Sequence, residues 1–138
     1  MSMVRTGVGV SILLGLVLSA LLWFTAQPAQ AQTVDECQAD IAALRVQTQS
    51  ATFTGQNAVK DQAGLVGKLD SASAKLSQGK FTDALANLQS FRTKVVTLDQ
   101  QGKISHTDAL ALIVSADEAI ACVQGLIDAQ AAPTAASA

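Results

Sequence analysis

The chain has 138 residues, of which 49% are apolar, 14% are charged and 4% are aromatic. This length fits a single domain and excludes a multidomain enzyme. The formal charge of −2 leaves no basic excess to neutralise a phosphate backbone or an anionic membrane surface, so we expect no nucleic-acid partner.

Residues 1–31 have the organisation of a secretory signal peptide. Arg5 precedes an apolar stretch over residues 12–24, and Ala29 and Ala31 supply the small side chains of a cleavage site before Gln32. The alternative is an uncleaved membrane anchor, but 13 residues are few for a bilayer span, which needs about 20. We therefore expect cleavage between Ala31 and Gln32, export to the periplasm or the medium, and no stable membrane span afterwards.

The two cysteines, Cys37 and Cys122, lie near the two ends of the chain that remains after cleavage. In an oxidising compartment they are expected to form one intramolecular disulfide. The chain-entropy model predicts that closing so long a loop stabilises the folded state by about 4 to 5 kcal/mol. The alternatives are a lipidated Cys37 and a metal pair. Asp35 and Glu36 before Cys37 do not suit lipidation, and two thiols with one histidine make a poor zinc shell.

The first predicted helix covers residues 34–50. Thr33 and Glu36 have the spacing of a capping box, and apolar residues then recur at steps of three and four. These apolar positions are Val34, Cys37, Ile41 and Leu44, so the thiol of Cys37 is expected to face the core.

The second predicted helix follows a break at residues 51–56 and ends at Gly79 as a left-handed cap. Gly64 and Gly67 inside it each cost about 1 kcal/mol relative to alanine. They indicate close approach of a neighbouring backbone, or otherwise a weak first turn. The predicted apolar stripe is Val59, Leu65, Leu69, Ala72 and Leu76.

The third helix is predicted to start at Thr82 as N-cap, with a staple from Phe81 to Leu85, and to end at residues 100–102. Its apolar stripe is Ala84, Leu85, Leu88, Phe91, Val95 and Leu98.

The fourth helix is predicted to open at Ser105, with Asp108 completing a second capping box. Residues 129–138 carry no charge and one proline, which predicts a disordered tail. The predicted apolar stripe of the fourth helix is Leu110, Ile113, Ala116, Ile120, Val123 and Ile127, with Cys122 beside it.

Four amphipathic segments without a strand-like alternation predict an all-α fold, a small four-helix bundle over residues 32–128. The first and fourth helices are neighbours if the disulfide forms. Many contact positions hold small residues, so the core is thin in large side chains and a covalent link between helices is physically sensible.

Several short motifs lie in the predicted bundle. They are residues 64–72 (Gly-Leu-Val-Gly-Lys-Leu-Asp-Ser-Ala), Leu76, Gly79 and Phe81, residues 84–91 (Ala-Leu-Ala-Asn-Leu-Gln-Ser-Phe), and residues 102–105 (Gly-Lys-Ile-Ser) before Leu112 and Ile113. Together these motifs resemble the FIMAH-type helical domain of bacterial exported proteins. The resemblance spans about residues 53–127. It implies an accessory helical module of exported proteins and brings no catalytic residues to this chain.

No set of residues in the sequence indicates a reaction. His106, in the first turn of the fourth helix, lacks a nucleophile to act upon and is expected to face solvent. The acidic pairs at 35–36 and 117–118, with Asp40, lack the spacing of a calcium loop, and Asp35 and Glu36 suit the first turn of a helix. We expect no catalytic residue, no metal site and no cofactor.

The sequence therefore favours an exported, non-enzymatic helical interaction or structural module whose partner is another exported or envelope protein. The alternative hypothesis is a carrier or sensor of a small ligand, with an apolar pocket between loosely packed helices.

Overall fold

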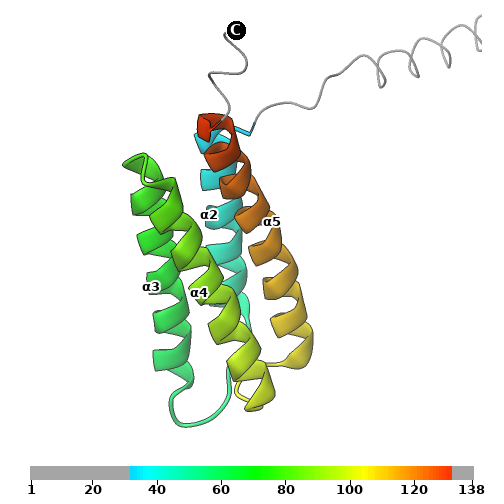
Figure 1. Cartoon of the computed structure of the whole chain (residues 1–138). Helices are drawn as coiled ribbons and strands as arrows, with labels where there is room; N and C mark the ends of the chain where they lie inside the picture. Colours follow the sequence, from blue (N-terminus) through cyan, green and yellow to red (C-terminus); the bar gives the residue numbers. More distant parts are fainter. Residues whose placement is uncertain (1–31, 132–138) are drawn as a thin grey trace, which may run out of the picture. The chain divides into compact units, whose positions relative to one another are not determined.

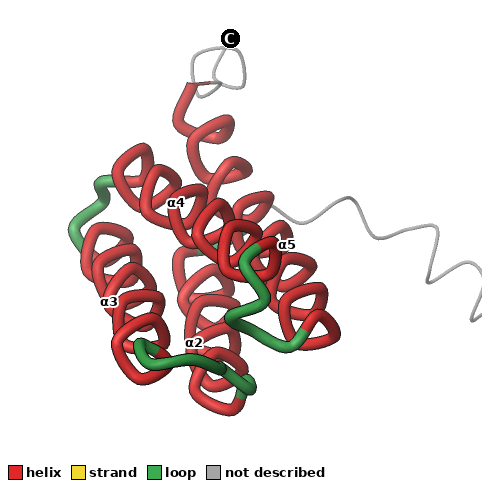
Figure 2. The backbone as a smooth tube through the Cα atoms, turned by 90° about the horizontal axis from the view of Figure 1, so that it is seen from below, coloured by secondary structure: helices red, strands yellow, loops and turns green. Residues whose placement is uncertain are grey.

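The computed structural model describes residues 32–131, which form four α-helices. They are α2 (Val34–Ser50), α3 (Ala58–Ser77), α4 (Phe81–Gln100) and α5 (His106–Ala131). Each helix packs against the next one in the chain, and α5 packs back against α2, so the four helices form a closed ring (Figure 1, Figure 2). The predicted all-α four-helix bundle is confirmed.

The two ends of the bundle are closed differently. One end holds the start of α2, the end of α5 and the short α3–α4 connection (Figure 1). The other end holds the connections 51–57 and 101–105, which pair through an isolated antiparallel bridge between Phe53 and Ile104. There, the backbone N–H of Ser105 donates to the carbonyl of Thr52 over 2.9 Å. The two connections therefore tie the second end together without a regular sheet.

The bounds of α2 and the end of α3 follow local signals in the sequence. Thr33 is the N-cap of α2: its hydroxyl accepts from the Glu36 N–H over 3.2 Å, and its own N–H donates to the Glu36 carboxylate over 2.9 Å. Gly79 follows α3 with a φ of +74°, the left-handed conformation expected there. Both predictions are confirmed.

The predicted N-cap of α4 and the predicted capping role of Asp108 need correction, whereas α5 begins at His106, directly after Ser105, as expected. Thr82 is not an N-cap, because α4 already begins at Phe81 and the Ala84 N–H donates to the carbonyl of Lys80. The turn after α3 ends at Lys80, whose N–H reaches back to Lys75, so the next helix starts at once. The Asp108 carboxylate accepts from the backbone N–H of Thr52 over 2.9 Å, and thus holds the 51–57 connection against α5.

The last helix is longer than expected. The bundle was predicted to end at residue 128, whereas α5 continues to Ala131. Alanine and glutamine are good helix formers, so Ala129, Gln130 and Ala131 extend the helix. The rest of the predicted tail lies outside the described residues.

The core is a continuous apolar cluster to which all four helices contribute. Among its largest fully buried side chains are Phe91 and several leucines. Thr48 is a buried polar residue, and its hydroxyl donates to the carbonyl of Leu44 over 2.8 Å, which satisfies it inside the core. The buried apolar residues are Cys37, Ile41, Leu44, Leu65, Leu69, Ala72, Leu76, Ala84, Leu88, Phe91, Val95, Leu98, Ile104, Ala109, Leu112, Ala116, Ala119, Cys122, Val123 and Leu126.

The apolar stripe predicted for α5 agrees with the fully buried face only at Ala116 and Val123. Leu110 is 50% exposed, and Ile113, Ile120 and Ile127 are only partly buried. Leu112 and Leu126 point inward instead, on a face that also buries Cys122. Because α5 is apolar around much of its circumference, periodicity alone does not fix which side faces the core.

Two predictions for α3 are also wrong. Val59 is 81% exposed, because it lies in the first turn at the bundle end and points away from the core. A Cβ built on Gly64 or Gly67 would meet nothing within 4 Å, so neither glycine is required by a neighbouring backbone. These two glycines lie on an exposed helix surface, where no packing contact offsets the conformational entropy that glycine loses in a helix.

We expect Gly64→Ala and Gly67→Ala each to raise the free energy of unfolding by about 1 kcal/mol, because alanine is the better helix former and no clash arises. Urea denaturation followed by circular dichroism measures the change. Gly79→Ala is the matched control: its φ of +74° penalises a side chain, so that variant should lose about 1 kcal/mol. A loss of stability at position 64 or 67 would contradict the open surface seen there.

The two halves of the bundle follow one pattern. The Nε atom of Arg45 lies 2.8 Å from Asp70 Oδ1, and the Nε atom of Arg92 lies 2.6 Å from Asp117 Oδ1. Both pairs are 25 residues apart in the sequence. The second pair follows the first by 47 positions, since 92 minus 45 and 117 minus 70 both give 47.

The same shift of 47 residues relates the cores of the two halves. It also relates Gly55 to Gly102, and both glycines have positive φ in the connections that follow α2 and α4. The bundle is therefore two helical hairpins of like construction, α2–α3 and α4–α5. The shift carries the buried residues Cys37, Ile41, Leu44, Thr48, Leu65, Leu69, Ala72 and Leu76 onto the buried residues Ala84, Leu88, Phe91, Val95, Leu112, Ala116, Ala119 and Val123.

The cysteines depart from this pattern. Cys37 corresponds to Ala84, and Cys122 corresponds to Lys75. The neighbouring helices α3 and α4 are connected directly by residues 78–80. The corresponding neighbours α2 and α5 are far apart in the sequence, so no short connection joins them (Figure 1). The disulfide supplies a covalent link at the edge where the backbone supplies none.

Candidate functional site

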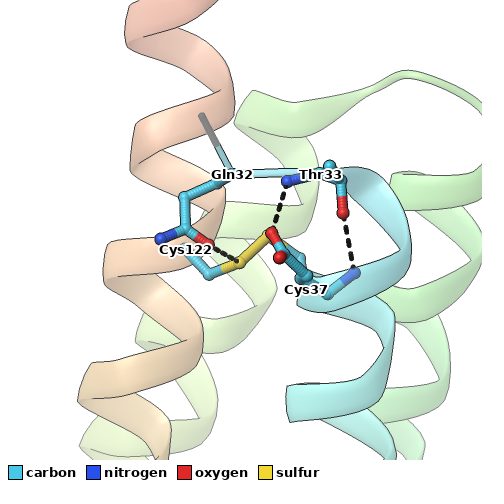
Figure 3. The surroundings of a disulfide bond; sticks show 5 residues. Gln32, Thr33, Cys37 and Cys122 are labelled. Carbon is cyan, nitrogen blue, oxygen red and sulfur yellow. Dashed lines mark hydrogen bonds between the residues drawn. A yellow bond between two sulfur atoms is a disulfide. The ribbon is translucent and has the colours of Figure 1, made fainter. Parts of the chain in front are cut away.

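The disulfide-closed end of the bundle is where the structure brings together Cys37, Cys122 and Gln32. Cys37, in the first turn of α2, is bonded to Cys122 of α5, with the two Cα atoms 5.5 Å apart (Figure 3). Both side chains are buried, at 0% and 4% exposure. The predicted pairing is confirmed, and neither cysteine is free for a metal or a lipid.

Gln32 covers this disulfide from outside. Its Oε1 atom lies 3.3 Å from Cys122 Sγ (Figure 3). A sulfur in a disulfide has no proton to donate, so this is a close polar contact and not a hydrogen bond. Of the predicted cleavage residues, Gln32 therefore lies beside the bridge, while Ala29 and Ala31 lie outside the described residues.

Gly125 makes room for Gln32. A Cβ at position 125 would lie 3.0 Å from Gln32 Cγ and 3.5 Å from Gln32 Cβ, so the Gln32 side chain passes over α5 where that helix has no side chain. This contact could not be predicted from the sequence, because it joins residues that only the folded bundle brings together. The first residue after the predicted cleavage point is thus packed onto the domain.

Two shallow hollows lie at the opposite end, on either side of the 51–57 connection. One, of about 250 Å³, is lined by Gln47, Ser50, Asp108 and neighbouring residues of α5. The other, of about 280 Å³, is lined by Phe53, Ala58, Val59, Gln62 and the residues before Phe53. Both are smaller than the roughly 300–1,000 Å³ typical of ligand pockets, and neither lies between the apolar faces of the helices.

The ionisable side chains singled out from the sequence lie on the surface. His106 is 72% exposed, as predicted, and its Nδ1 lies 3.0 Å from the Asp99 carboxylate. Asp117 is paired with Arg92 across α4 and α5. Asp35 and Glu36 lie in the first turn of α2, where they complement the helix dipole. Within residues 32–131 no three potential metal ligands lie together.

One buried carboxylate was missed by sequence reasoning. Asp61, in the first turn of α3, is 13% exposed, and its Oδ1 lies 3.6 Å from Lys94 Nζ of α4. Its Oδ2 atom has no hydrogen-bond partner among the described residues. The only signal in the sequence is the position of an acid in a helix first turn, which does not reveal that a lysine on another helix lies near it.

Within the described part of the chain, α5 alone is long and apolar enough to cross a membrane by length and composition, with a mean hydropathy of 1.7 over its most apolar window. One third of that window is buried in the bundle. Core helices of soluble bundles also meet this criterion.

No protein-family model matches the chain, and comparison with curated proteins and with solved structures finds no significant match. The resemblance to FIMAH-type domains therefore depends on the short motifs themselves.

Proposed function

We propose that the chain is exported, that its leader is removed after Ala31, and that the bundle works without catalysis by binding another exported or envelope protein through its surface. The observation that carries this proposal is the buried bridge between Cys37 and Cys122. Protein disulfides persist in oxidising compartments and are rare in a reducing cytoplasm. A secretory leader in the same sequence leads to the same compartment.

The packing of the bundle favours action through the surface over action through a pocket. The apolar faces of the four helices fill the interior with one cluster of buried side chains. A carrier of an apolar ligand needs room among those side chains, and the two hollows described above lie instead at the end of the bundle, beside the 51–57 connection. The resemblance to accessory helical modules of exported proteins supports the same choice.

The surface also offers apolar side chains that a partner can cover. Val46 of α2 is 60% exposed, and Leu110 and Val114 of α5, one helical turn apart, are 50% and 58% exposed. Val59 of α3 is the most exposed of these large apolar residues. Apolar contacts of this kind contribute strongly to protein association when they become buried.

The proposal is tested by affinity capture of partners on the oxidised bundle. The oxidised protein is immobilised and exposed to the exported fraction of its own host. Four single variants are treated in the same way, namely Val46→Ser, Val59→Ser, Leu110→Ser and Val114→Ser. We expect one protein to be retained by the parent chain and at least tenfold less by one or more variants, while other variants retain it fully and serve as folded controls. Identical retention by the parent, all four variants and an unrelated helical bundle would overturn the proposal.

A further inference from the structure

We propose that Gln32, once it becomes the first residue, cyclises to a pyroglutamyl residue that blocks the N-terminus of the exported protein. The inference rests on the proposed cleavage after Ala31, because residue 32 has a free α-amine only when the peptide bond before it is cut. It adds a modification site to the disulfide-closed end of the bundle.

The chemistry requires only the residue itself. The α-amine of an N-terminal glutamine attacks its own side-chain carbonyl carbon Cδ, and the three carbons between them make the product a five-membered lactam. A bond forms between the α-nitrogen and Cδ, the bond from Cδ to Nε2 breaks, and the amide nitrogen leaves as ammonia with a proton from the amine. No oxidant, reductant or cofactor takes part. The reaction is favoured because both groups belong to one residue.

The position of Gln32 in the fold suits a neutral residue. It directly precedes Thr33, the N-cap of α2, and so lies at the helix end where the macrodipole disfavours a positive charge. Conversion of the α-ammonium group to a lactam removes a positive charge from this end of the helix.

The contacts of Gln32 also suit a compact ring. Its Cβ and Cγ atoms pack over Gly125, and its amide oxygen lies beside Cys122 Sγ (Figure 3). The lactam keeps these two methylenes and the carbonyl oxygen. Gln32 is nonetheless exposed on its outer side, so its α-amine is accessible to solvent and its ammonia can leave.

The test is the mass of the protein recovered from the exported fraction of its host, measured intact after reduction and then on its N-terminal peptide. We expect a chain that begins at residue 32 and is lighter by one ammonia, and from which pyroglutamyl aminopeptidase, acting on the denatured chain, exposes Thr33. A chain that begins at residue 32 with its full mass overturns cyclisation and leaves the export proposal standing. A chain that begins anywhere else, or keeps the leader, overturns both cyclisation and the proposed cleavage after Ala31, because residue 32 then has no α-amine.

Two controls make the result specific. In Gln32→Asn the amide is one methylene nearer to the amine, so attack would need a strained four-membered ring and the exported variant should keep its full mass. A synthetic peptide of residues 32–44, carried through the same cold and neutral handling, measures cyclisation during preparation. The proposal requires the protein to be cyclised at least severalfold more than this peptide, and an equal extent in the two overturns it.

Discussion

Replacing Cys37 and Cys122 together by alanine is expected to lower the free energy of unfolding by about 4 to 5 kcal/mol. The bridge joins residues that are 85 positions apart, so it removes much of the conformational freedom of the unfolded chain. This loss is comparable to the whole stability of many small domains, which is about 5 to 15 kcal/mol. The variant should therefore melt at a much lower temperature than the parent.

The measurement is urea denaturation followed by far-ultraviolet circular dichroism, because the chain after residue 31 has no tryptophan or tyrosine to report by fluorescence. Reducing the parent protein and blocking its thiols provides a second way to open the bridge. The two opened forms should have similar midpoints, well below that of the oxidised parent. If the alanine variant stayed within 1 kcal/mol of the parent, the bridge would not be the principal constraint on the α2–α5 edge.

The arrangement of the two hairpins explains why the bridge is placed where it is. The α3–α4 edge is held by the three residues that connect these helices, and the α4–α5 edge by Arg92–Asp117 together with the connection 101–105. Exposed ion pairs of this kind contribute little, roughly 0 to 1 kcal/mol each. At the end of the bundle that holds the start of α2 and the end of α5, the disulfide is the covalent link between them.

The parts of the fold that depend on local signals could be predicted from the sequence. The capping box at Thr33 and Glu36 placed the start of α2, and Gly79 placed the turn after α3, because each feature works through contacts within a few residues. The pairing of Cys37 with Cys122 followed from there being only two cysteines in a chain predicted to carry a secretory leader.

Features that depend on tertiary contacts could not be predicted. The buried face of α5 is set by what Leu112 and Leu126 meet inside the bundle, and not by the apolar periodicity of the helix. The openness around Gly64 and the contact between Gln32 and Gly125 likewise depend on which helices are neighbours. The 47-residue repeat is weak in the sequence, because corresponding core positions are both buried but seldom hold the same residue type.

The largest single-residue effect is expected at Phe91. It is fully buried in α4 and is among the largest side chains of the core, so Phe91→Ala should lower the free energy of unfolding by about 3 to 5 kcal/mol through lost burial and a cavity. Phe81, at the start of α4, is only partly buried, and Phe81→Ala is the matched control with an expected loss of about 1 to 2 kcal/mol. Urea denaturation of the oxidised proteins measures both.

The equivalence of the two hairpins extends this prediction to α2. Leu44 occupies in α2 the position that Phe91 occupies in α4, and both side chains are fully buried. Leu44→Ala should therefore also lower the free energy of unfolding, by about 2 to 5 kcal/mol, although leucine is smaller than phenylalanine.

Phe91→Ala in the chain without the disulfide combines two losses of stability that together approach the stability of a small domain, and we expect that variant to be largely unfolded at 25 °C. A cooperative helical melt of that variant near the parent's midpoint would show that neither the core at Phe91 nor the bridge limits the stability of the bundle.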